Sequence, residues 1–183
     1  MITTPMSSVV RTLTLAALLS VAVAAGASAQ QAAGGATKLD TFKDWTAFTS
    51  DTPDGKMCFI ATQPTASKYS QTTTGRDPAF LQITRIPSKS VVNEVSSIAG
   101  YTFLASADVT TDVDGAKFKM FLDASHPDTT WADASQEAAL VDAMKKGHVF
   151  TLTGTSKRKT LVTDTYSLSG ISAALDAIAK ACP

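Results

Sequence analysis

The chain of 183 residues contains only two cysteines, Cys58 and Cys182. In an exported protein an even number of cysteines favours a disulfide. A bond between these two would fasten the end of the chain to an early segment, and the chain-entropy model gives such a long loop about 5 kcal/mol of stabilisation. The alternative is a zinc site that adds His126 and His148. Zinc ligands usually come in closely spaced pairs. These four residues are isolated, so the sequence favours the disulfide.

The first 29 residues have the composition of a cleaved signal peptide. Arg11 supplies the positive charge, residues 13–23 are mostly apolar, and Ala27-Ser28-Ala29 resembles a cleavage site. About a dozen apolar residues are too few for the roughly 20 that a membrane-spanning helix needs, although an uncleaved anchor is the alternative. No cysteine follows the cleavage site, which argues against a lipid anchor.

We therefore expect three parts: a signal peptide over residues 1–29, a flexible lead-in over 30–38 and a single domain over 39–183. The mature protein is expected in the periplasm, at the outer membrane or secreted, with no transmembrane segment. The chain has 16 basic and 16 acidic residues. A nucleic-acid-binding domain normally has a basic excess, so no nucleic-acid partner is expected.

The pattern of the domain predicts a mainly β fold, an antiparallel sandwich or barrel-like domain with two helices. Thr52-Pro53-Asp54-Gly55 is typical of a hairpin turn, and a polar connection follows the strand that begins at His148. Residues 63–78 are expected to form a long surface loop. The expected strands cover residues 42–49, 57–62, 80–86, 90–95, 107–113, 116–122, 148–153 and 160–166.

Two segments have the signature of helices. Residues 133–147 begin with Asp133 or Ser135 as a potential cap and end at Gly147. The second helix is expected to follow Ser169 and run to about Ala181. Its apolar residues recur every three or four positions and share a face with Cys182. We therefore expect this C-terminal helix to pack on the sheet and to be fastened there by the disulfide.

The search for catalytic or cofactor-binding motifs identifies little. Ser156, His148 and Asp164 are the residues that a hydrolase triad would use, but no nucleophile elbow surrounds the serine. Asp112 and Asp114 resemble part of a calcium loop without its remaining ligands. No phosphate-binding or dinucleotide-binding glycine motif is present. The sequence predicts a non-enzymatic protein without a cofactor or metal, and a purely structural role for these residues.

Five basic residues form a possible anion-binding or partner-binding surface: Lys145, Lys146, Lys157, Arg158 and Lys159. Acidic partners or anionic components of the outer membrane are its expected ligands. The alternative is that the helix pair complements the helix dipole and the others are simply solvated. Trp131 is expected to anchor the core, because the chain has few aromatic residues; the alternative is a surface aromatic that takes part in recognition.

Several segments together resemble a known family, with the most specific similarity in the block 154–170 and the closing cysteine. They are Phe42-Lys43-Asp44-Trp45, Cys58, Gly100-Tyr101-Thr102-Phe103, Trp131, Ala143-Met144-Lys145-Lys146-Gly147, Gly154-Thr155-Ser156, Asp164-Thr165-Tyr166-Ser167-Leu168-Ser169-Gly170 and Cys182. This pattern is similar to the invasion-associated locus B family of alphaproteobacteria. One departure is Arg158-Lys159-Thr160, where the family leads us to expect Arg-Gly-Thr.

The resemblance implies an exported envelope protein, linked in pathogenic relatives to the invasion of host cells. It brings no catalytic residues. We therefore expect an accessory factor in host-cell invasion or envelope integrity that acts through contacts with an envelope or host-surface protein. The alternative is a periplasmic module that binds a small ligand or glycan.

Overall fold

The computed structural model describes residues 35–73 and 75–183. The expected signal peptide and most of the expected lead-in lie outside these residues. The strands are β1 (Thr37–Phe42), β2 (Trp45–Thr52), β3 (Gly55–Thr62), β4 (Ala66–Tyr69), β5 (Phe80–Ile86), β6 (Val91–Ile98), β7 (Thr110–Val113), β8 (Ala116–Leu122), β9 (Thr129–Ala132), β10 (Val149–Thr155) and β11 (Leu161–Ser167). The helices are α1 (Glu137–Lys146) and α2 (Ile171–Ala181), and a short 3-10 turn, η1 (Pro87–Lys89), precedes β6.

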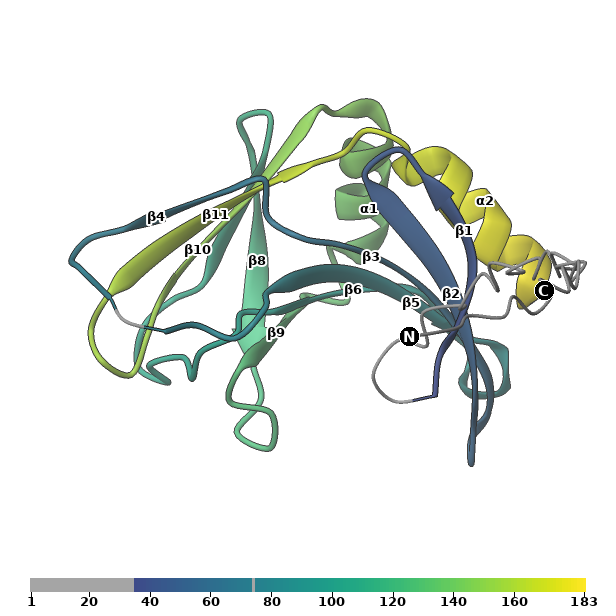
Figure 1. The fold of residues 1–183 in the computed structure, drawn as a ribbon, viewed down its shortest axis with the longest axis horizontal. Coiled ribbons are helices and arrows are strands. Elements are labelled where there is room, and N and C mark those ends of the chain that lie inside the picture. Colours follow the sequence, from purple (N-terminus) through teal and green to yellow (C-terminus); the bar gives the residue numbers. More distant parts are fainter. Residues whose placement is uncertain (1–34, 74) are drawn as a thin grey trace, which may run out of the picture.

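All eleven strands form one antiparallel sheet in the order β1-β2-β3-β5-β6-β9-β8-β7-β10-β11-β4. The sheet bends strongly, so that β4, β10 and β11 lie at the opposite end of the molecule from β1 and β2 (Figure 1). It is not closed, because β1 and β4 are its two edges. The prediction of a mainly β, antiparallel domain with two helices is confirmed, and the sheet is a single open one.

The hairpin expected at Thr52–Gly55 is present, and so is the one expected after the strand that begins at His148, where β10 pairs with β11. β2 and β3 meet at Thr52 and Gly55, where a glycine with φ of +102° closes the turn. β7 and β8 meet at Val113 and Ala116. The two residues between them both have positive φ, as the tightest hairpin turns require.

The observed elements differ from the expected ones at four places. β4 lies within residues 63–78, expected to be a loop, and pairs with β11. β1 begins at Thr37, inside the expected lead-in, because its backbone pairs with β2. α1 begins only at Glu137, because Asp133 accepts hydrogen bonds from Ser135 in a preceding turn. α2 is preceded by Gly170, with φ of +95°, and not by a capping serine.

The two helices pack on the same part of the molecule. α2 contacts β1, β2 and β3, and α1 contacts β6, β7 and α2. The buried face of α2 consists of Ile171, Ala174, Leu175 and Ile178, as its periodicity predicted. Neither helix is long or apolar enough to span a membrane, a finding that covers the described residues only.

The structure contains the expected disulfide between Cys58 in β3 and Cys182 directly after α2. Both residues are buried, with 0% and 1% of their surface exposed. The Arg85 Nε atom donates a hydrogen bond of 2.7 Å to the Cys182 carbonyl. The end of the chain is therefore held to the sheet by a covalent bond and by an arginine from β5.

Candidate functional site

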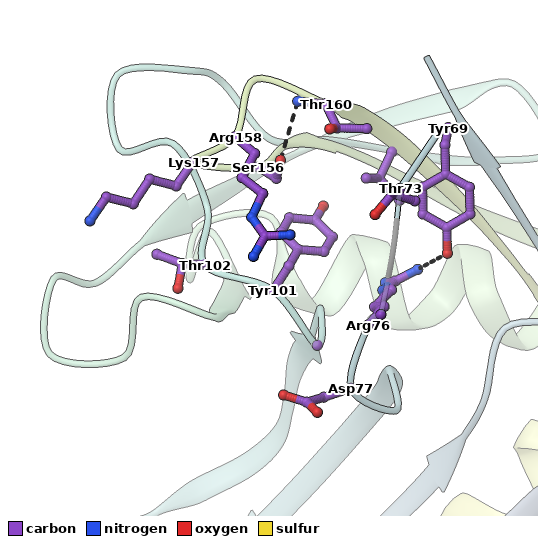
Figure 2. Close-up of a pocket in the computed structure, with 13 residues that line it drawn as sticks. Tyr69, Thr73, Arg76, Asp77, Tyr101, Thr102, Ser156, Lys157, Arg158 and Thr160 are labelled. Carbon is purple, nitrogen blue, oxygen red and sulfur yellow. Dashed lines mark hydrogen bonds between the residues drawn. The ribbon is translucent and has the colours of Figure 1, made fainter. Parts of the chain in front are cut away.

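A cleft of about 490 Å³ lies beside the tip of the β10–β11 hairpin. It is bounded by β4 and the loop after it, by residues 100–102, and by the hairpin tip (Figure 2). We call it the hairpin cleft. Its lining side chains include Tyr69, Arg76, Asp77, Tyr101, Thr102, Lys157, Arg158 and Val162.

An ion pair between Arg76 and Asp164 supports one wall of the cleft. The two Nη atoms of Arg76 donate hydrogen bonds of 2.8 and 2.6 Å to the two carboxylate oxygens of Asp164. Asp164 is fully buried and also accepts a 2.6 Å hydrogen bond from the Ser67 hydroxyl in β4. The Arg76 Nε atom donates to the Ala99 carbonyl at 2.7 Å. Arg76 therefore joins the loop after β4 to β11 and to the segment before Tyr101.

The environment of Arg76 keeps its guanidinium positively charged. Burial by itself lowers the pKa of Arg76, but the hydrogen bonds and charge of Asp164 outweigh it and raise that pKa above the usual value. The guanidinium carbon also lies 5.2 Å from the centre of the Tyr101 ring, a cation–π contact. Burial raises the pKa of Tyr101, so its phenol stays neutral.

Two glycines allow the close approach of the segments around the cleft. Gly100 has φ of +69°, and a Cβ atom there would lie 2.1 Å from the Asp77 carbonyl oxygen. A Cβ atom on Gly154 would lie 2.5 Å from the Phe103 ring. Both contacts are shorter than side chains tolerate, so these positions require glycine. Gly100 lets residues 100–103 approach the segment before β5, and Gly154 lets them approach β10. The Tyr101 ring between these contacts lines the cleft.

The hairpin tip is a tight, positively charged turn. The Lys159 amide donates to the Ser156 carbonyl at 2.7 Å, and the Thr160 amide donates to the Ser156 hydroxyl at 3.2 Å. Lys159 has φ of +63°, a conformation that favours glycine. The backbone is therefore strained at Lys159. The family resemblance leads us to expect glycine at the same position.

The structure does not assemble the triad that the sequence analysis weighed. Ser156 and His148 flank opposite ends of the seven-residue strand β10, so the strand separates them by roughly 25 Å at about 3.3 Å per residue. Asp164 is bound to Arg76 and faces neither of them. Ser156 is a buried turn residue, and the side chain of His148 is 90% exposed.

The same strand separates the five basic residues into two groups. Lys145 and Lys146 end α1, just before β10, whereas Lys157, Arg158 and Lys159 follow its far end. The two groups therefore lie at opposite ends of β10. Only Lys157 and Arg158 line the hairpin cleft.

The remaining candidate ligands have structural roles. The Asp112 carboxylate accepts from the Gly115 amide at 2.7 Å. Asp114 accepts from the His148 and Val149 amides, and the first of these hydrogen bonds is the main reason that its pKa is lowered. His126 is exposed, and both cysteines belong to the disulfide. No group of three or more potential metal ligands occurs in residues 35–73 and 75–183.

Trp131 does not anchor the core as predicted. Thr130 and Ala132 are the inward-facing residues of β9, so the alternation of the strand turns Trp131 to the other face. There it stacks on Phe121, which is half-exposed, with ring centres 5.9 Å apart, and the His126 ring meets its edge.

Sequence reasoning missed Arg76 as a residue of the cleft. It lies in a polar stretch without periodicity, 88 residues before Asp164. One signal was present: Asp164 occupies the inward alternation of β11 between Val162 and Tyr166, and a buried carboxylate needs a partner. The sequence does not indicate which of its basic residues is that partner.

The fold and the site define a class: a disulfide-closed, mainly β domain with a polar cleft at one end of an open sheet. The family model for invasion associated locus B (IalB) protein matches residues 45–179. The chain therefore belongs to the IalB family. Its fold is similar to a crystal structure of invasion associated protein b from Bartonella henselae, with a TM-score of 0.50 and 17% identity over 77% of this chain and 97% of that one. No curated protein matches the sequence.

Proposed function

We propose that this protein is an exported, non-enzymatic envelope protein that acts through contacts with an envelope or host-surface protein. Its role would be that of an accessory factor in host-cell invasion or envelope integrity, after removal of the leader near Ala29. The observation that carries this proposal is the buried disulfide across a domain that matches the IalB family, because such bonds persist in oxidising compartments such as the periplasm. The separation of Ser156, His148 and Asp164 supports binding over catalysis.

The test starts with the native organism's own envelope. Cells that produce the full tagged chain are fractionated, cross-linked and subjected to affinity purification, and the captured proteins are identified by mass spectrometry. We expect the protein in the envelope fraction with its leader removed, its two sulfurs joined and a reproducible partner. A cytosolic protein that retains its leader and two free thiols would refute the proposal.

The two basic groups are proposed contact surfaces for anionic outer-membrane components. Their separation allows each to be tested alone, with Lys145 and Lys146 replaced by alanine in one variant and Lys157, Arg158 and Lys159 in another. We expect each variant to bind vesicles with anionic lipid more weakly than wild type. Equal binding by both variants and wild type would exclude both surfaces.

A second candidate function is a periplasmic binding module for a small ligand or glycan. The hairpin cleft favours it, since its volume of about 490 Å³ lies within the usual range for ligand pockets. A screen of small sugars and metabolites by protein-observed NMR would test it. Shifts confined to residues around Tyr101 and Arg158 are expected, and a screen in which no compound shifts these residues would exclude it.

A further inference from the structure

The hairpin cleft contains positive charge that the protein does not neutralise. Lys157 and Arg158 both line it and are exposed. Among the residues that the structure describes, neither forms an ion pair. Figure 2 shows the Arg158 side chain extending from the hairpin tip toward the middle of the cleft, whereas Lys157 points away from it.

The third basic residue of the cleft, Arg76, already binds other groups of the protein and is not available to a ligand. The Nε atom of Arg76 and both of its Nη atoms donate hydrogen bonds to the protein, and its charge is balanced by Asp164. Its guanidinium also lies over the Tyr101 ring. Arg76 is therefore a positioning residue that fixes an aromatic wall of the cleft, and Arg158 is the arginine that a ligand can reach.

The other walls combine aromatic rings with hydroxyl groups. Tyr69 and Tyr101 contribute the rings, Thr73 and Thr102 contribute exposed hydroxyls, and Val162 is apolar. Rings that cover a sugar face and hydroxyls that exchange hydrogen bonds with its hydroxyl groups suit a saccharide. The only carboxylate among the lining residues, Asp77, lies at the far end of the cleft from Arg158 (Figure 2).

We propose that the hairpin cleft binds an anionic saccharide, a sugar that bears a carboxylate or a phosphate, and that Arg158 contacts the anionic group. The planar guanidinium donates paired hydrogen bonds to either kind of oxyanion. This inference rests on the second candidate function, the binding of a small ligand or glycan in the cleft, and adds the charge of the ligand.

The strained hairpin tip agrees with this proposal. Lys159 keeps a third positive charge in the turn at a position with φ of +63°, where glycine would adopt the same backbone without strain. Strain of this kind concentrates at functional sites. A charge retained there increases the positive potential at the mouth of the cleft and attracts anions to it.

The test uses two matched pairs of probes and the purified full chain. One pair is glucuronate and glucose, and the other is glucose 6-phosphate and glucose, titrated in NMR experiments. We expect at least one anionic probe to shift residues around Tyr101, Thr102 and Arg158, with affinity about tenfold higher than that of glucose. The stronger anion identifies whether the natural ligand carries a carboxylate or a phosphate.

Variants separate charge from structure. Arg158→Ala is expected to weaken binding of the anionic probe about tenfold and to change glucose binding much less. Arg158→Lys should restore part of the loss, and Lys145→Ala at the other end of β10 should have no effect. Equal affinity for glucose and the anionic probes would overturn the anion proposal and leave cleft binding standing. Anionic probes that cause no shift in the cleft would overturn it as well, and binding by neutral ligands alone would still support the second candidate function.

Discussion

Arg76 and Asp164 form a bidentate ion pair across 88 residues of sequence, with 12% and 1% of their side-chain surfaces exposed. This pair fastens the loop after β4 to β11. Because Asp164 has no access to water, the cost of losing its partner is larger than for a surface ion pair.

We predict that Arg76→Ala lowers the free energy of unfolding by about 3–5 kcal/mol, since it leaves a buried charge without its partner. Arg76→Lys is expected to lose less, because it keeps the charge but not the paired geometry. Urea unfolding followed by tryptophan fluorescence measures both. The double variant Arg76→Met/Asp164→Leu serves as the control and should be more stable than Arg76→Ala. An Arg76→Ala variant as stable as wild type would contradict the assigned role.

We predict that Lys159→Gly stabilises the protein by about 0.5–1 kcal/mol. The left-handed backbone costs a lysine about 1–2 kcal/mol, and this gain exceeds the entropy that a glycine loses on folding. Thermal unfolding measures the change. Lys157→Gly is the control and should destabilise, because Lys157 is not among the residues with positive φ. If both variants shift the midpoint in the same direction, the strain at Lys159 is not the cause.

A third prediction compares two glycines with similar backbone and different surroundings. Gly100 and Gly115 have φ of +69° and +98°, but only Gly100 has a carbonyl oxygen 2.1 Å from its would-be Cβ, whereas Gly115 has open space. Gly100→Ala should therefore cost several times the roughly 1–2 kcal/mol of left-handed strain that Gly115→Ala costs. Chemical unfolding of the two variants tests this difference. Equal losses would mean that Asp77 moves away readily.

The fourth prediction concerns the tail of the protein. Cys182→Ser should increase hydrogen exchange in α2 first, since the helix then loses its covalent link and is held only by packing and by the Arg85 hydrogen bond to the backbone. The double variant Cys58→Ser/Cys182→Ser should lose up to about 5 kcal/mol, the chain-entropy limit for a loop this long. Thiol titration of the unreduced wild type is expected to find no free thiol, and two free thiols would refute the bond.

The sequence was informative wherever structure is decided locally. Turn residues and alternation located the β2–β3 hairpin, and helical periodicity placed Cys182 on the buried face of α2. β4 was missed because four residues amid prolines and polar residues carry no pattern of their own, and pairing with β11 alone makes them a strand. Trp131 was misplaced because the boundaries of β9 decide which of its residues face inward.

The cleft could not be predicted from local sequence patterns, because contacts between distant segments form it. Its walls come from segments that are far apart in sequence, joined by one ion pair and two close glycine contacts. The basic tip was identified as charged, but its partners were not. Lys145 and Lys146 were expected near the hairpin tip because the sequence does not reveal the direction in which β10 runs.

The disulfide joins two residues 124 positions apart in sequence and so closes a ring around almost the whole domain. A protease that cuts one exposed loop within that ring leaves a nicked molecule whose pieces travel together until the sulfurs are reduced. A protein of the cell envelope is expected to meet proteases. The disulfide does not prevent a cut in the backbone, but it keeps the cut pieces together in one molecule.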